Sequence, residues 1–343
     1  MRGRRACGAI ETVKAAGASW LERLDRWQRR RRWAGFAVAV GKRYSEDGAA
    51  RHGARIAYYA FFSIFPLMLA FVSILGFALE DDAALREDIL DSAYADMPVI
   101  GPFIRSDVGA IGGSGIALAV GIAVALWAGL GVTLALGQAL DRVWSISPVE
   151  QPSWLARRIR GLAMLLVGGV ALVASSALGG AAASGQLEPA LATVASIAGS
   201  LAIDALILLS AFRLLTTATP RLRELMPGVA AAAVGLLVLQ ALGGRYVEGT
   251  IGRATDTYGL FATVIGLLSW LSIAAQLVLI AAELNAVRSL GLWPRSLSGP
   301  LTAADRKAFE GYARGALHDT RATISVSWPP QDVGADRERL APR

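Results

Sequence analysis

Residues 113–136 read GSGIALAVGIAVALWAGLGVTLAL, and no charged residue occurs between Asp107 and Asp141. As a helix rising about 1.5 Å per residue, this run is long enough to cross the ~30 Å hydrocarbon core of a bilayer. Small residues recur along it at every fourth position, namely Ala117, Gly121, Ala125 and Gly129. Because such a face lets another helix approach closely, we expect these residues to serve helix packing rather than a substrate path.

Five further runs have the same character. The predicted spans are residues 56–79, 113–136, 161–184, 191–215, 225–244 and 258–282. They lack the period-two alternation of barrel strands, and lipid cannot satisfy open strand edges, so we expect helices. The composition excludes a soluble enzyme, since 54% of the residues are hydrophobic and 18% are charged, against about 25% charged in soluble proteins. The predicted fold class is all-α: a polytopic membrane protein with six transmembrane helices.

The distribution of charge predicts the orientation of these helices. Residues 80–110 carry eight Asp or Glu residues and only two Arg residues. The segments after the second and fourth spans are instead rich in arginine, with Arg142, Arg157 and Arg160 in one and Arg221 and Arg223 in the other. The positive-inside rule therefore places both termini in the cytoplasm.

The two ends of the chain differ from its middle. Residues 1–55 contain fourteen Lys or Arg residues against five Asp or Glu residues, although the net charge of the chain is only +7. Beside a membrane span, such a basic segment is expected to contact anionic lipid headgroups, and no nucleic-acid partner is expected. Residues 51–290 are predicted to form the six-helix domain. Residues 291–343 are predicted to be a polar cytoplasmic tail that is largely disordered or loosely helical.

Within the basic arm, residues 1–50, three large apolar residues recur at helical spacing among arginines. They are Trp20, Leu24 and Trp27. This pattern predicts an amphipathic helix on the inner leaflet, or alternatively a solvated, partly disordered arm.

One ionisable residue lies deep within a predicted span. Asp204 is near the middle of the fourth span, where a carboxylate costs about 2.5–3.5 kcal/mol on insertion scales. It is therefore a candidate for a proton or ion relay or for a headgroup contact, and the alternative is a structural hydrogen bond to a neighbouring span.

The first span contains a proline that is predicted to disturb its helix. Pro66 removes a backbone hydrogen bond and should kink or break the helix near residues 62–66. Tyr58, Tyr59 and Ser63 lie on the preceding turns. Together with Pro66 and Asp204 they form the candidate substrate path, and an interfacial aromatic belt is the alternative for the tyrosines.

A second set of polar residues is predicted at the cytoplasmic face. It consists of Arg142, Glu283, Asn285 and Arg213. We expect Glu283 to pair with an arginine of the loop around Arg142 or Arg157, and Arg213 to extend to the membrane interface.

Metal and cofactor chemistry finds little support in the sequence. Cys7 is the only cysteine, and His52 and His318 both lie outside the apolar runs. None of the common zinc or nucleotide motifs occurs, so we predict no cofactor, no metal and no catalytic residue.

Several short segments resemble one membrane protein family. Residues 57–67, AYYAFFSIFPL, resemble the first-span motif of the YihY/BrkB family, also labelled ribonuclease BN-like. Similar family elements occur in order within residues 40–290, namely DRVW at 141–144, MPG at 226–228, YG at 258–259, WL at 270–271 and AELNA at 282–286. The chain departs from the family at Arg55, where an apolar residue is usual, and at Asp141, where asparagine is usual.

The resemblance implies a six-helix protein of the bacterial inner membrane. It favours transport or flipping of a lipid or another amphiphile in envelope integrity, and the alternative is a scaffold that transports nothing. The ribonuclease label is interpreted as a misassignment, because the sequence contains no metal-ligand cluster and no phosphate-binding loop. We therefore predict that the chain is not an enzyme.

Overall fold

The computed structural model describes residue 20 and residues 22–78, 115–183, 188–246, 260–298 and 300–328. Every regular element in these ranges is helical, which confirms the predicted all-α class for the described part of the chain. The helices are α2 (Arg32–Glu46), α3 (Ala49–Ala78), α6 (Gly115–Val143), α7 (Trp154–Ala183), α8 (Pro189–Leu214), α9 (Leu222–Tyr246), α11 (Leu260–Ser289) and α12 (Ala303–Gly315).

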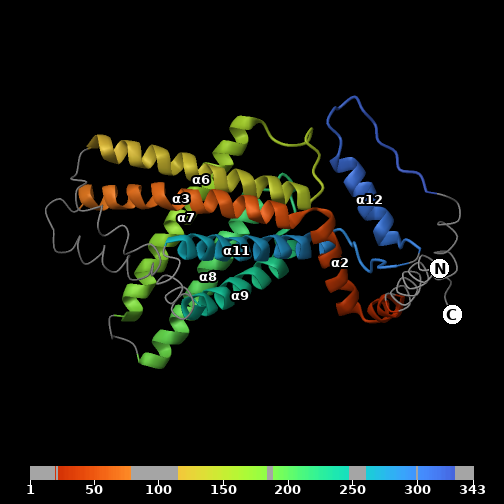
Figure 1. Cartoon of the computed structure of the whole chain (residues 1–343), viewed down its shortest axis with the longest axis horizontal. Helices are drawn as coiled ribbons and strands as arrows, with labels where there is room; N and C mark the ends of the chain where they lie inside the picture. The colour runs from red at the N-terminus through yellow and green to blue at the C-terminus, as the bar shows by residue number, and fades with distance from the viewer. Residues whose placement is uncertain are drawn as a thin grey trace, which may run out of the picture.

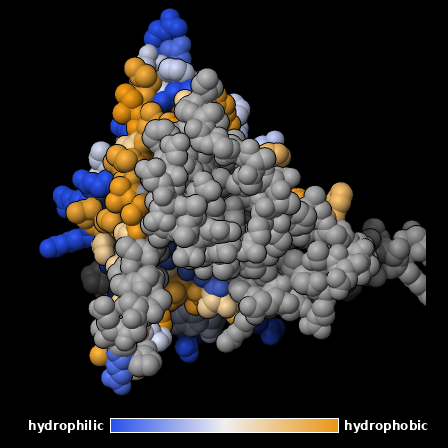
Figure 2. All heavy atoms as spheres, turned by 90° about the vertical axis from the view of Figure 1, so that its left-hand side faces the viewer, coloured by the Kyte–Doolittle hydropathy of each residue, from blue (hydrophilic) through white to orange (hydrophobic). Residues whose placement is uncertain are grey.

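Five of these helices contain segments long and apolar enough to cross a membrane. The segments are Ala119–Val143, Trp154–Ser175, Ala190–Leu214, Leu222–Leu242 and Val264–Ser289. α3 has a similar length, but the side chains of residues 68–78 lie outside the described set. Large apolar side chains on these helices are exposed, such as Trp127 at 74% and Val173 at 71%. Figure 2 shows such hydrophobic side chains along the flank of the molecule, as expected for a surface that faces lipid.

The six long helices form a closed ring in chain order. α3 packs on α6, α6 on α7, α7 on α8, α8 on α9 and α9 on α11, and α11 returns to α3. Among the described side chains, a large buried apolar cluster lies at one end of this ring, and it includes Leu140, Phe212, Leu225 and Ala286. The helices α2 and α12 lie at this same end, which we call the capped end, whereas α7 and α8 slant away from α3 and α6 toward the other end (Figure 1).

The cap is built from the chain on both sides of the ring. α2 ends at Asp47–Gly48, where Gly48 has a φ of +65° that favours glycine, and α3 follows at once. Residues 22–30 are also helical and precede α2. The apolar contacts of the cap join Ala39 and Val40 of α2 to Val287 of α11 and Ala308 of α12.

The described part of the tail contains one regular helix. Thr302 and Asp305 form a capping box that starts α12, and Ala304, Asp305 and Ala308 are buried. Residues 329–343 lie outside the described residues. Of the kink or break predicted near residues 62–66, the break does not occur, since residues 49–78 form a single helix that contains Pro66. Proline removes only one hydrogen bond from this 30-residue helix.

The observed helices extend beyond the predicted apolar runs. α6, α7 and α11 continue at the capped end by about two turns, at 3.6 residues per turn, to Val143, Trp154 and Ser289 respectively. These extensions carry polar residues, and they place Arg142 and Glu283 in contact with the cap.

Candidate functional site

A buried cluster of charged groups joins the cap to the ring. Arg43 of α2 places its Nε atom 3.2 Å from Oε2 of Glu283 in α11 and 3.4 Å from Oδ2 of Asp47. Arg142 of α6 lies 3.5 Å from Oδ1 of Asp47. The ring of Tyr312 in α12 lies against both arginines. We call these five residues the Arg43 cluster, and it links four helices and the turn between α2 and α3.

The inner members of the Arg43 cluster are removed from solvent. Glu283 is fully buried, and the side chains of Arg43 and Asp47 are 1% exposed, whereas that of Arg142 is 41% exposed. Nη2 of Arg43 donates to the Val143 carbonyl (2.6 Å) and to Oγ of Ser145 (2.9 Å). These bonds hold the guanidinium against the end of α6.

A second network fixes the tail to α2. Arg295 is fully buried and donates to both Glu46 oxygens (2.6 and 3.2 Å) and to Asp305 (2.9 Å). Burial disfavours the ionised form of Asp305, but hydrogen bonds from the Ser296 amide, Lys42 and Thr302 outweigh it and lower its pKa to about 2. The Tyr312 hydroxyl donates to Glu46 (2.8 Å), so the two networks meet at α12.

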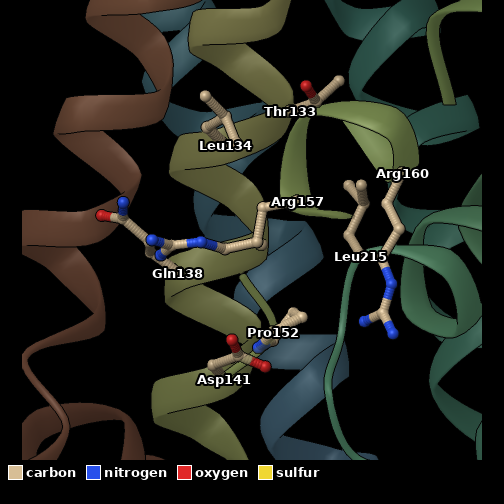
Figure 3. Close-up of a pocket in the computed structure, with 9 residues that line it drawn as sticks. Thr133, Leu134, Gln138, Asp141, Pro152, Arg157, Arg160 and Leu215 are labelled. Atoms are coloured by element: carbon tan, nitrogen blue, oxygen red, sulfur yellow. The ribbon is translucent and has the colours of Figure 1, made fainter. Parts of the chain in front are cut away.

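The turn after α8 is held by Asp141 of α6. Its carboxylate accepts hydrogen bonds from the amide (2.7 Å) and the hydroxyl (3.1 Å) of Thr217. Beside it lies a pocket of about 20 Å³, enough for one water molecule. Arg157 and Arg160 of α7 line this pocket and extend in different directions from it, Arg157 on the side of Gln138 and Arg160 on the side of Leu215 (Figure 3).

A larger groove opens between α6 and α7. It has a volume of about 860 Å³, and its lining is apolar. One lining residue, Leu126, belongs to α6, and the others belong to α7, namely Leu162, Leu165, Leu166, Gly169, Val170, Val173 and Ala174. This volume falls in the range of small-molecule sites, about 300–1,000 Å³. Trp154, Arg157 and Arg158 lie on the first turn of the same α7, and Arg158 stacks on the Trp154 ring at 4.1 Å. The groove therefore runs along a helix whose near end is aromatic and basic.

The residues predicted at the cytoplasmic face lie in three separate places. Arg142 and Glu283 both belong to the Arg43 cluster, but the predicted partner of Glu283 is wrong, because its carboxylate pairs with Arg43. Asn285 lies between α11 and α9, where its Oδ1 accepts from the Gly228 amide (2.7 Å). Arg213 is exposed and contacts the Pro220 carbonyl.

The residues of the predicted substrate path do not line any one described pocket. Tyr58 is exposed and Tyr59 packs against Gly131 of α6. Ser63 is buried and donates to the Ala60 carbonyl (2.8 Å) of its own helix, one turn before Pro66. Asp204 is half-buried in α8, which packs on α7 and α9 rather than closely on α3. Its Oδ2 atom is buried and has no hydrogen-bond partner among the described residues.

The small residues of α6 lie at helix contacts in the described part. Gly121, Ala125 and Gly129 are buried, and a Cβ atom at Gly129 would meet Leu165 of α7 at 2.9 Å. The side chain of Ala117 lies outside the described residues. Arg55, which departs from the family pattern, donates to Gln138 of α6 (2.7 Å) and lies over the Tyr59 ring.

Sequence reasoning missed the residues that hold the cap. Arg43 and Asp47, like Lys42 and Glu46, are opposite charges four positions apart on one helix, a spacing that favours pairing. This spacing could have been used to predict the two pairs within α2. The partner of Arg43 in α11 could not be predicted, since nothing in the sequence relates residue 43 to residue 283. In the described ranges, no three His, Cys, Asp or Glu side chains are grouped as metal ligands.

Comparison with known proteins places this arrangement among membrane proteins. Residues 40–300 match the family described as virulence factor BrkB. Inner membrane protein YhjD of Escherichia coli (strain K12) is 23% identical over 266 residues, which cover 71% of this chain and 78% of that protein. A UPF0761 membrane protein of Laribacter hongkongensis (strain HLHK9) is 27% identical over 274 residues, covering 76% of this chain and 62% of that protein.

A third relative carries a different kind of name. YfkH of Bacillus subtilis (strain 168), named as ribonuclease-like, is 25% identical over 268 residues, which cover 74% of this chain and 94% of that protein. No solved structure matches the chain significantly.

Proposed function

The chain belongs to the BrkB family and is a multi-pass inner membrane protein, and from this premise we propose that it moves a lipid or another amphiphile between the two leaflets. The observation that carries the proposal is the apolar groove between α6 and α7, which is open at the flank of the bundle. An acyl chain fits a groove lined by leucine and valine, and its polar headgroup would then lie at the depth of Arg157 and Arg158.

The proposal includes six spans with both ends in the cytoplasm. Arginines lie in the end turns of α6, α7, α8 and α9 that face the capped end, among them Arg142, Arg157, Arg213 and Arg223. By the positive-inside rule the capped end is the cytoplasmic one. In this proposal α3 counts as the sixth span, in addition to the five segments described above.

The basic arm contacts anionic headgroups in this proposal. The helix at residues 22–30 turns polar side chains inward, where Asp25 accepts from the Leu297 amide and Gln28 donates to the Arg295 carbonyl. Trp27 and Leu24 are left exposed. A polarity-sensitive dye on Leu24→Cys, in a Cys7→Ser background, is expected to report a less polar environment in anionic nanodiscs than in zwitterionic ones, and equal emission in both would exclude this contact.

The transport proposal is tested by lipid scrambling in liposomes that contain labelled lipids. Gly168 and Gly169 both have open space where a Cβ atom would lie, but only Gly169 lines the groove. Gly169→Phe is therefore expected to slow lipid movement, and Gly168→Phe is the matched control that should not. Asp204→Asn, assayed beside them, tests whether the unpartnered carboxyl of α8 takes part. Absence of movement by the folded wild-type protein with several headgroups would overturn the proposal.

A scaffold that transports nothing is the second candidate. It is favoured by Tyr59 and Ser63, which occupy helix contacts or bond their own helix rather than line a cavity. In that case Gly169→Phe and Gly168→Phe would behave alike. A nuclease is not proposed, since the only support is the name of one distant relative.

A further inference from the structure

The carboxyl groups of Asp47 and Glu283 share a buried site with too few hydrogen-bond donors. Both lie within 3.4 Å of the same Arg43 nitrogen. None of their four oxygens accepts a well-formed hydrogen bond from the described residues, although all four are shielded from solvent. An ionised carboxylate normally accepts several hydrogen bonds, and burying it without them is unfavourable.

The charged and titratable groups around this pair come from every adjoining element. α2 contributes Arg43 and Glu46, α3 contributes His52, α6 contributes Arg142, and α12 contributes Tyr312. Arg43 directs its Nη2 atom to Val143 and Ser145 instead of to the carboxylates. Glu46 is already paired with Arg295.

None of these neighbours supplies the missing donors. Arg142 is half-exposed and stands 3.5 Å from Asp47. His52 of α3 makes no hydrogen bond to either carboxyl group in the described residues. Burial raises the pKa of the Asp47 carboxyl, although Arg43 and Arg142 act in the opposite direction.

We propose that Asp47 and Glu283 form a proton-binding site, in which one proton bridges the two carboxyl groups and holds the cap on the helical ring. A proton on one carboxyl provides the donor that the other lacks, as in other close carboxylate pairs. When the proton leaves, two buried carboxylates face a single Arg43 nitrogen. Water or the Arg142 side chain must then enter, which loosens α2 and α12 from α6 and α11.

The site lies where such a change has the greatest structural effect. Asp47 ends α2 and begins the turn into α3, and Glu283 lies in the last turns of α11. Tyr312 of α12 stacks on both arginines of the cluster. Binding or loss of one proton at this site therefore affects the turn between α2 and α3, the end of α11 and the packing of α12. This role does not depend on whether the protein moves lipid.

Infrared spectroscopy of the purified full-length protein tests the proposal directly. At neutral pH the wild-type protein should show the carbonyl band of a protonated carboxylic acid, and this band should be absent from Glu283→Gln in the difference spectrum. Asp47→Asn should also remove it, and serves if Glu283→Gln does not fold. The exposed variant Asp319→Asn is the control and should retain the band. Unchanged spectra for both Asp47 and Glu283 variants would overturn the proposal.

Thermal unfolding in detergent between pH 5 and pH 8 gives an independent readout. The midpoint of the wild type should fall as pH rises and the shared proton is lost, because the raised pKa of an acid stabilises the folded state only while the proton is bound. In Glu283→Gln the dependence should be flattened, and in Asp319→Asn it should persist. The same pH dependence in Glu283→Gln and the wild type would contradict the proposal. Neither measurement requires lipid movement, so a failure of transport leaves both interpretable.

Discussion

The contact between α9 and α11 allows a substitution whose effect can be calculated from the structure. The Gly228 amide donates to Oδ1 of Asn285 (2.7 Å), and a Cβ atom at Gly228 would lie 2.6 Å from Cγ of Asn285 and closer still to its Nδ2 atom and to the Ala281 carbonyl. Because the carbonyl is backbone, Gly228→Ala must move the helices apart. Gly235 lies on the same helix, and its Cβ atom would meet Leu277 at an ordinary 3.6 Å.

The expected cost of Gly228→Ala is the balance of three effects. Overpacking a close contact costs about 1–3 kcal/mol, and loss of the Asn285 hydrogen bond adds about 1 kcal/mol. Alanine returns about 0.5–1 kcal/mol through its higher helix propensity. The net loss in the free energy of unfolding is therefore about 1–3 kcal/mol. For Gly235→Ala only the propensity effect applies, so this variant should equal or slightly exceed the wild type.

Unfolding in detergent, followed by circular dichroism, measures both variants under one condition. The predicted order of midpoints is Gly228→Ala lowest, with Gly235→Ala at or above the wild type. Equal midpoints for the two variants would refute the argument, since they differ only in what the new methyl group meets. A loss in both would indicate that glycine is required along α9 for a reason other than this contact.

Three further predictions concern the capped end. Arg43→Lys should lower the unfolding midpoint by an amount equivalent to about 1–3 kcal/mol, because an ammonium cannot bond Val143 and the carboxylates together, whereas the exposed Arg321→Lys should not. The pKa of Asp305 is lowered to about 2 in the folded protein. Its ionised carboxylate therefore stabilises the fold above the unfolded-state pKa of about 4, and this effect is lost as pH falls toward 2. The thermal midpoint should drop between these two pH values, and Asp305→Asn should remove the drop. Asp141→Asn retains an acceptor for the Thr217 amide and should unfold within about 0.5 kcal/mol of the wild type, whereas Asp141→Ala should cost about 1–3 kcal/mol.

The transmembrane helices could be predicted from the sequence because their signal is local. A charge-free run such as residues 113–136 indicates a helix without reference to any other part of the chain. The cap depends on pairs far apart, such as Arg43 with Glu283 and Gln28 with the Arg295 carbonyl. No periodicity within either segment specifies such a partner.

In the tail, a local signal is more specific than the composition. The polar, mixed charge of the tail favours disorder or a loose helix, whereas Thr302 followed three residues later by Asp305 is a helix-start pattern, and Ala304 and Ala308 share one helix face. The acidic residue of that pattern also binds Arg295 and Lys42. The Asp305 side chain therefore both caps the start of α12 and binds this helix to Arg295 and Lys42. The second role cannot be predicted from the spacing of residues in the sequence.

The polar contacts of the cap hold some helices of the ring and not others. In the described residues the Arg43 cluster and the Arg295 network hold the turn into α3 and the ends of α6 and α11. Among the described contacts neither network reaches α7 or α8, and Asp141 of α6 instead binds Thr217 in the turn after α8. The apolar groove therefore lies between α6, which the cap contacts hold, and α7, which these contacts do not reach.

If lipid movement requires α7 and α8 to shift against α6, a covalent link across that boundary should stop it. Gly129→Cys with Leu165→Cys suits a short bifunctional thiol reagent in a Cys7→Ser background, because a Cβ atom at Gly129 lies against Leu165 and the smaller cysteine there leaves room for it. A control link joins α3 to α11 through Gly53→Cys and Gln276→Cys, which are also in contact. Linking α6 to α7 is expected to abolish scrambling and the control link to spare it. Equal inhibition by both links would mean that the whole ring moves, and equal activity would mean that the groove works without a shift of α7.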